Sequence, residues 1–283
     1  MTGPPPTPPA CGRGVRAALN QGTTALAAAS ATPRLDAELL MAHALGATRE
    51  QLLLNRLDDA TPAAFAALLA RRLAHEPIAY ITGSRAFWTI ELQVGPGVLI
   101  PRPDSETLIE AALAHFTDRP PETILDLGTG PGTLLLAALA EWPAAHGLGI
   151  DASEPALAYA RRNAAALHMA DRARFQIGDW AAGLDARFDL ILANPPYIGT
   201  VEPLPRDVAE HEPAGALYAG PDGLDDYRRI APQLRPLLAP GGAAILEIGH
   251  MQAPAVTALL AAEGLAVALA RDLAGRPRAL IAT

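Results

Sequence analysis

The 283-residue sequence has few cysteines and no long apolar run, and these absences exclude whole classes of protein. A single cysteine, Cys11, cannot form an internal disulfide. The apolar stretches, such as Ala25–Ala29 and Thr133–Ala140, are far shorter than the ~20 residues that cross a bilayer, so we expect no membrane span. Residues 1–10 are rich in proline and lack the basic start and apolar run of a secretion signal. They predict a flexible tail on a cytoplasmic protein.

Lysine is absent altogether, and every basic side chain is an arginine. The net charge of -8 argues against a general nucleic-acid binder, because phosphate binding needs concentrated positive charge. The seven histidines are not spaced with other ligand types as metal sites require, so no metal is expected. Half of the residues are hydrophobic, which is enough to build a large domain and a small one.

The residue pattern changes twice along the chain and predicts three regions. Residues 1–75 carry helix signals: Gly46 is a stop, Thr48 and Gln51 have capping-box spacing, and Thr61–Pro62 is a start. We interpret them as a small helical bundle. Residues 76–105 are β-prone with interspersed glycine and proline, which favours a hairpin linker.

Residues 106–283 alternate apolar strands with helical stretches, which is typical of an α/β domain with a mainly parallel sheet. The predicted strands are Thr123–Leu127, Leu148–Ile150, Phe175–Ile177, Phe188–Leu192 and Ala243–Ile248. Ligands of such sheets bind beyond the carboxyl ends of the strands. Functional residues are therefore expected directly after each strand.

A glycine-rich turn follows the first predicted strand. It reads Asp126, Leu127, Gly128, Thr129, Gly130, Pro131, Gly132. Alternate glycines allow a tight turn in which a ligand lies against bare backbone at a helix N-terminus. Asp151, nineteen positions after Gly132, ends the second strand, where a carboxylate can accept hydrogen bonds from ribose hydroxyls. The glycine turn and Asp151 together predict a nucleoside cofactor. Rossmann dehydrogenases bind their cofactor with a similar turn and acid, but their strict pattern needs Gly or Ala where this chain has Thr133.

Asp179 and Trp180 follow the third strand, at the edge where an adenine base would lie. Trp180 offers a stacking face and the neighbouring acid an acceptor for the exocyclic amine. The alternative interpretation of Trp180 is an ordinary core residue, since large aromatics are usually buried.

The segment after the fourth strand is Asn194, Pro195, Pro196, Tyr197. Consecutive prolines hold the chain extended and leave carbonyls without local partners. Asn194 supplies an acceptor and donors on a short stem. A Pro-Pro pair alone is weak evidence in this proline-rich chain, but its place directly after a buried strand predicts a substrate site.

Asn194–Tyr197 resembles the Asn-Pro-Pro-Tyr motif of methyltransferases that modify planar nitrogens. Over nearly its whole length, the chain resembles the peptide chain release factor glutamine N5-methyltransferases of the HemK type. The supporting segments are Glu76–Pro77, Tyr80–Gly83, Val98–Glu106, Glu212–Pro213, Gly220–Leu224, Glu247–Gln252 and Asp272–Arg278. Two departures are Pro131, where the family usually has a small polar residue, and Asp104–Ser105, which replaces a commoner Glu-Thr.

The resemblance implies a Rossmann-like, seven-stranded catalytic domain with one antiparallel strand, after a five-helix substrate-recognition domain and a hairpin linker. It implies S-adenosylmethionine as cofactor, bound by the glycine turn, Asp151, Asp179, Trp180 and Asn194. The acceptor would be the glutamine of the Gly-Gly-Gln loop in class 1 release factors. Asn194, Pro195, Pro196 and Tyr197 would hold its amide, with Arg102 and Glu106 near the cleft.

Three alternatives stay open at this point. A ribosomal-protein glutamine methyltransferase shares Asn-Pro-Pro-Tyr, although Pro101–Glu106 favours the release-factor branch. A DNA adenine N6-methyltransferase would need a basic recognition region and energy to flip a base, which the acidic net charge does not suit. A noncatalytic nucleoside-binding module would need the glycine turn but not Asn194.

Overall fold

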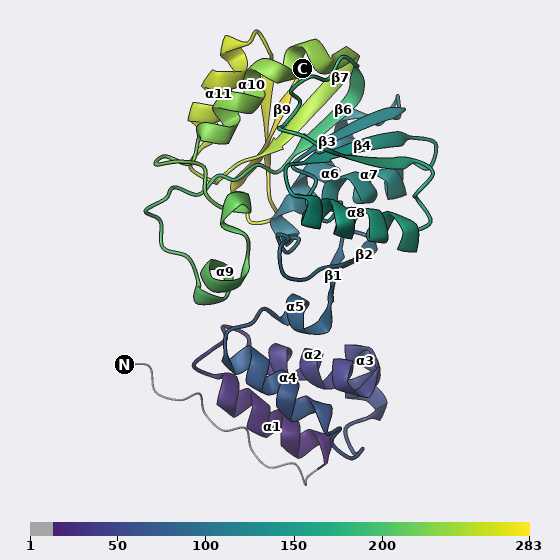
Figure 1. Ribbon diagram of the computed structural model, residues 1–283, viewed down its shortest axis with the longest axis vertical. Helices are drawn as coiled ribbons and strands as arrows, with labels where there is room; N and C mark the ends of the chain where they lie inside the picture. The colour runs from purple at the N-terminus through teal and green to yellow at the C-terminus, as the bar shows by residue number, and fades with distance from the viewer. Residues whose placement is uncertain (1–13) are drawn as a thin grey trace. The chain divides into compact units, whose positions relative to one another are not determined.

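A computed structural model of the protein describes residues 14–283. The predicted proline-rich tail and Cys11 lie outside the described residues. The chain divides into two compact units (Figure 1). The first runs as far as Ser84 and also includes Leu204–His211; the second consists of Arg85–Pro203 and Glu212–Thr283. We call them the helical unit and the sheet unit.

The helical unit contains the five helices α1 (Val15–Leu26), α2 (Pro33–Leu45), α3 (Arg49–Asn55), α4 (Ala64–Leu73) and α5 (Ile78–Thr82), and the later helix α9 (Arg206–His211). Its core is aliphatic, with Leu19, Leu40 and Leu52 fully buried and Phe65 nearly so. A buried ion pair joins Arg72 Nε to Asp36 Oδ2 at 2.7 Å. Arg72 also lies 3.5 Å from Asp207 of α9.

The helix signals of this region were mostly confirmed. Gly46 ends α2 with φ +60°, a conformation that glycine adopts without steric cost. Thr48 and Gln51 form the reciprocal capping box at the start of α3. The Thr61–Pro62 start was wrong: α4 begins at Ala64, after Ala63, and no side chain caps it.

The sheet unit is built on seven strands in the order β5-β4-β3-β6-β7-β9-β8. The strands are β3 (Thr123–Leu127), β4 (His146–Asp151), β5 (Ala173–Ile177), β6 (Phe188–Ala193), β7 (Leu238–Glu247), β8 (Val267–Arg271) and β9 (Pro277–Ala282). Only β9 is antiparallel to its neighbours, as the family resemblance implied. The five strands predicted from the pattern are all present. β3 has the predicted bounds, β4, β5 and β6 are longer than predicted, and β7 begins at Leu238, before the predicted Ala243, and ends at Glu247, one residue before the predicted end.

Helices cover both faces of this sheet (Figure 1). One layer holds α6 (Glu106–His115), α7 (Thr133–Glu141) and α8 (Glu154–Ala166), and the other α10 (Asp225–Leu237) and α11 (Ala253–Ala262). Tyr227 and Ile230 of α10 pack into a core with strand residues such as Ile191 and Leu246. Two short 3-10 helices, η1 (Pro103–Ser105) and η2 (Ala214–Ala216), lie in the connecting loops.

The predicted hairpin is present but covers only part of residues 76–105: it consists of β1 (Ser84–Phe87) and β2 (Ile90–Gln93). The prediction of β structure at Tyr80 and Ile81 was wrong, because this stretch forms the helix α5. Side chains of the sheet unit fix it in place. Asn163 of α8 both accepts from the Gln93 N–H and donates to its carbonyl. The Trp88 indole N–H donates to Glu141 of α7 at 2.6 Å. The strand β2 and the turn before it are therefore anchored to helices of the sheet unit.

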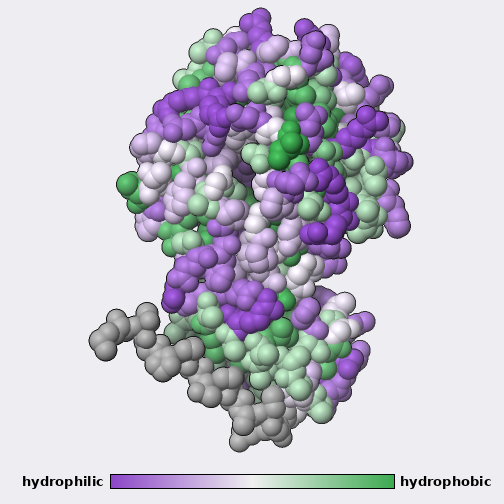
Figure 2. All heavy atoms as spheres, viewed as in Figure 1, coloured by the Kyte–Doolittle hydropathy of each residue, from purple (hydrophilic) through white to green (hydrophobic). Residues whose placement is uncertain are grey.

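Figure 2 shows hydrophilic residues interspersed with hydrophobic ones over the face in view. No helix within residues 14–283 combines the length and apolar character needed to span a bilayer.

Candidate active site

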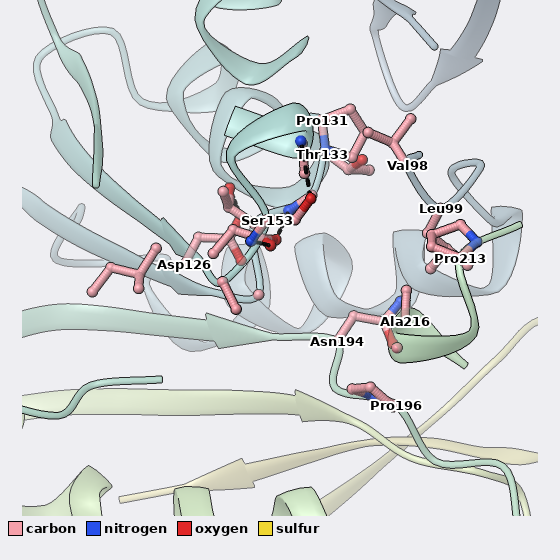
Figure 3. Close-up of a pocket in the computed structure, with 18 of the residues that line it drawn as sticks. Val98, Leu99, Asp126, Pro131, Thr133, Ser153, Asn194, Pro196, Pro213 and Ala216 are labelled. Atoms are coloured by element: carbon pink, nitrogen blue, oxygen red, sulfur yellow. Dashed lines mark hydrogen bonds between the residues drawn. The ribbon is translucent and has the colours of Figure 1, made fainter. Parts of the chain in front are cut away.

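A cavity of about 370 Å³ lies at the carboxyl ends of the parallel strands, within the size range of small-molecule sites. Because β3, β4 and β6 run parallel, the residues that follow them meet at one edge of the sheet. Figure 3 shows these residues converging on the cavity. Of the predicted site residues, those that line it are Asp126, Gly128, Thr129, Gly130, Asp151, Asp179, Trp180, Asn194, Pro196 and Arg102.

The glycine turn between β3 and α7 brings bare backbone to the cavity. Gly128 and Gly130 have backbone φ angles of +72° and +56°, which residues other than glycine rarely adopt. A Cβ on Gly128 would lie 3.1 Å from the Trp180 ring, whereas one on Gly130 would meet nothing within 4 Å. Leu127 is instead buried in the core and Gly132 caps α7, so neither lines the cavity.

Asp126 is a buried carboxylate at the floor of the cavity, only 1% exposed. Its Oδ2 accepts from the Thr129 hydroxyl at 2.6 Å and from the Leu135 N–H at 3.1 Å. Its Oδ1 has no hydrogen-bond partner among the described residues. Burial raises the pKa of Asp126 to about 7, only partly offset by the Thr129 hydrogen bond. A buried acid with one unpaired oxygen beside the cavity favours a positively charged ligand there.

Asp151 ends β4 and is fixed by two backbone groups. Its Oδ2 accepts from Gly130 N and its Oδ1 from Ser153 N, both at 2.8 Å. Burial raises the pKa of Asp151, while these backbone hydrogen bonds oppose the rise. Each carboxylate oxygen has a second lone pair that remains available to a ligand hydroxyl.

Trp180 and Asp179 form one wall of the cavity, and α10 holds both. The Trp180 indole N–H donates to Asp226 Oδ1 at 3.2 Å. Arg229 donates to the carboxylates of Asp226 and Asp179. Trp180 has φ +50°, a strained value for a bulky residue. Asp226 and Arg229 line the cavity but were missed from the sequence; their only signal was an i, i+3 acid–arginine pair at a helix start.

Asn194 lies half-buried at the end of β6, where its amide is hydrogen-bonded on one side only. Its Nδ2 donates to Ser105 Oγ at 3.1 Å. Ser105 in turn donates to the Glu247 carboxylate. An amide held through its nitrogen keeps its oxygen able to accept a further hydrogen bond. Ser105 lines the cavity too; sequence reasoning named it only as a departure from the family pattern and gave it no role in the site.

Tyr197, the last residue of the Asn-Pro-Pro-Tyr segment, is held by hydrogen bonds to Gln252 and Glu247. The Tyr197 carbonyl accepts from Gln252 Nε2 at 2.9 Å, and the same amide donates to the Gly223 carbonyl at 3.1 Å. The Tyr197 hydroxyl lies 3.5 Å from Glu247 Oε1. Burial, with the nearby Glu247 charge, raises the pKa of Tyr197 to about 12. Pro196 lines the cavity, while Pro195 and Tyr197 do not.

The two residues predicted near the cleft are placed differently. Arg102 lines the cavity and donates to the buried Glu212 at 2.6 Å. Glu106 does not line it; its carboxylate accepts from the Trp88 N–H at 2.9 Å and so supports the hairpin. Between Gly14 and Thr283, no group of three or more His, Cys, Asp or Glu side chains is placed to hold a metal ion.

Comparisons with known proteins agree with this geometry. Residues 17–83 match the family described as PrmC N-terminal domain, and residues 119–253 match the methyltransferase domain family. The release factor glutamine methyltransferase of Caulobacter vibrioides is 44% identical over 88% of this chain and 89% of its own. That of Cereibacter sphaeroides is 47% identical over 86% and 88%. The T. thermophilus 16S rRNA N2 G1207 methyltransferase, solved with AdoMet and guanosine, shares the fold, with a TM-score of 0.50, 22% identity, and coverage of 70% of this chain and 49% of that one.

Proposed function

This chain belongs to the family of release factor glutamine methyltransferases, and from that membership we propose that it methylates the side-chain amide nitrogen, N5, of a release factor glutamine. The glutamine is that of the Gly-Gly-Gln loop in class 1 peptide chain release factors, so the product would modulate translation termination. The observation that carries the proposal is the Asn194 amide at the cavity, whose nitrogen is held by a hydrogen bond to Ser105.

The chemical problem is that an amide nitrogen is a poor nucleophile, because its lone pair is delocalised into the carbonyl. In the proposal, Asn194 Oδ1 accepts one N–H group of the substrate amide at the cavity and the Pro195 backbone carbonyl accepts the other, which turns the nitrogen toward the methyl donor. Pro195 and Tyr197 do not line the cavity themselves, so the Pro195 contact and the packing of Tyr197 against the amide plane would be made beside it. Orientation of this kind supplies effective molarities of ~10⁵ M or more, so no strong base is required. The methyl donor would leave as an uncharged thioether, and the methylated nitrogen would lose one of its two protons to water.

The cavity suits S-adenosylmethionine, a cationic nucleoside cofactor. When bound, it supplies an electrophilic methyl group on a sulfonium. The unpartnered Asp126 Oδ1 fits its positive charge, and the bare backbone at Gly130 admits close approach. Asp151 would accept from the ribose hydroxyls, and Trp180 with Asp179 would hold the adenine. Both the methyltransferase fold and the buried acid support this assignment.

Residues 1–75, which make up most of the helical unit, are proposed to recognise the protein substrate, with residues 76–105 as linker. Protein substrates need broad contact surfaces, and none of the described residues before Gly97 lines the cavity. A substrate that works on the ribosome would place the enzyme in the cytoplasm. A ribosomal-protein glutamine would meet the same amide-binding groups and is the alternative acceptor.

The test is single-turnover methylation of a purified release factor, with mass mapping of the product. Asn194→Ala should lower the rate by ~10²–10³, the range for removing one preorganised polar group, and should change cofactor affinity much less. Asn194→Asp keeps an acceptor but loses the donor to Ser105, so its activity should be intermediate. The control is Gln176→Ala, which removes an exposed amide of β5 outside the cavity.

A near wild-type rate for Asn194→Ala would contradict the orientation mechanism. Methylation of a ribosomal-protein glutamine in place of the release factor would move the assignment to the alternative acceptor.

A further inference from the structure

Three polar side chains from distant parts of the sheet unit form a hydrogen-bonded chain that leads from the cavity into the core. Ser105 ends η1, Asn194 follows β6, and Glu247 ends β7. Ser105 is 2% exposed and Glu247 is fully buried, so water does not compete for these hydrogen bonds. The chain runs from Asn194 Nδ2 to Ser105 Oγ, and from Ser105 Oγ to Glu247 Oε2.

We propose that Ser105 and Glu247 are positioning residues that set which end of the Asn194 amide faces the substrate. This inference rests on the proposed function, in which the Asn194 oxygen accepts from the substrate amide. Neither Ser105 nor Glu247 is given a role there.

The direction of the hydrogen bonds follows from what each group can donate. An ionised carboxylate only accepts, so Glu247 takes the single hydroxyl proton of Ser105. The Ser105 oxygen then has only lone pairs left, and these can pair with the NH₂ end of Asn194 but not with its oxygen. The charge on Glu247 thus selects one of the two orientations of the Asn194 amide, the one that presents Oδ1 to the cavity.

The surroundings of Glu247 make this selection sensitive to pH. Burial raises the pKa of Glu247 to about 7, partly offset by Ser105 and by the charge of Arg278. The other groups that face it are Asp104 on η1, Tyr197 after β6 and Tyr227 on α10, whose hydroxyl donates to the Glu247 backbone carbonyl at 2.7 Å. Arg278 is shared with Asp104 at 2.9 Å and Asp272 at 3.6 Å.

Protonation of Glu247 reverses the direction of the hydrogen bonds between Glu247, Ser105 and Asn194. A neutral Glu247 can donate to Ser105, whose own proton is then free to bind the Asn194 oxygen and draw it away from the substrate. The fraction of correctly oriented Asn194 therefore falls as the pH drops through about 7.

The first test compares Ser105→Ala with Ser105→Thr in single-turnover methylation at pH 8 with saturating cofactor. Ser105→Ala should lower the rate about 10-fold, the factor of one ordinary hydrogen bond. Ser105→Thr keeps the hydroxyl and should restore the rate to within about threefold, consistent with one added methyl group. Cofactor affinity, measured by calorimetry, should be the same in both variants.

The second test is the pH profile of Glu247→Gln between pH 6 and 8.5. The methylation rate of the wild-type enzyme should fall as the pH drops below about 7. Glu247→Gln, whose side chain carries no charge, should be slower at pH 8 and should not show this decline at acid pH, which we call the acid limb. Saturating cofactor is essential because Asp126 titrates in the same range.

The outcomes separate the two proposals. A wild-type enzyme that leaves the release factor unmodified overturns the proposed function and this inference with it. With an active wild type, this inference alone is overturned by a fully active Ser105→Ala, by equal loss in Ser105→Ala and Ser105→Thr, or by an unchanged acid limb in Glu247→Gln.

Discussion

Replacing Asp151 tests the cofactor site most directly. Two of the lone pairs on its carboxylate are occupied by Gly130 N and Ser153 N, which leaves one on each oxygen for a ribose hydroxyl. A hydrogen bond to a charged group contributes about 1.5–3 kcal/mol. Asp151→Ala should therefore weaken S-adenosylmethionine binding roughly 10- to 150-fold. It also leaves Gly130 N without its acceptor, which loosens the turn that the cofactor would lie against.

The assay is calorimetric titration of each variant with S-adenosylmethionine. Asp151→Asn separates the two effects, because its remaining oxygen keeps one acceptor while its NH₂ faces a backbone donor; an intermediate affinity is expected. Asp185→Ala is the matched control, an exposed acid outside the cavity. If Asp151→Ala and Asp185→Ala bind the cofactor with the wild-type dissociation constant, Asp151 is not part of the site.

Three further outcomes are expected. Removal of residues 1–75 should leave cofactor affinity within about twofold but impair methylation of whole release factor, since the described residues that line the cavity all lie at Gly97 or beyond; equal activity in the two forms would show that the bundle does not bind substrate. Asp36→Ala leaves Arg72 buried without its main partner and should destabilise the helical unit by about 3–5 kcal/mol in urea unfolding, whereas Asp58→Ala, at an exposed pair, should cost under ~1 kcal/mol; similar losses in both would contradict this. Because burial raises the pKa values of Asp126 and Glu247 to about 7, the native protein holds their protons more tightly than the unfolded chain. Stability from this source is present at acid pH and lost as the pH rises through 7, so the free energy of unfolding should be lower at pH 8 than at pH 5.5, and a flat profile would refute it.

Local signals predicted the parts of the site that lie next to strand ends. Gly128, Asp151 and Asn194 each follow a parallel strand, so a correct strand pattern was enough to bring them together. The partners that hold these residues were not predictable in the same way. Ser105 and Glu247 are 142 residues apart, and nothing in either local sequence specifies that η1 packs against the end of β7.

The same limit applied to the elements themselves. The strands β8 and β9 were expected only through the family resemblance, because Val267–Arg271 is rich in alanine and lacks the β-branched pattern of a strand. Pairing with β9 determines that segment's structure. Thr61–Pro62 had the composition of a helix start, yet α4 begins at Ala64.

The helical unit is not made from one continuous stretch of chain, because α9, which belongs to it, is synthesised long after α5. Its apolar core comes entirely from residues 15–81, so a folded bundle can leave the ribosome early. Asp207 is made about 135 residues after Arg72, a delay on the order of 10 s at ordinary elongation rates. Asn194–Tyr197 is translated within that interval. The bundle thus acquires α9 only after the Asn-Pro-Pro-Tyr segment has been made.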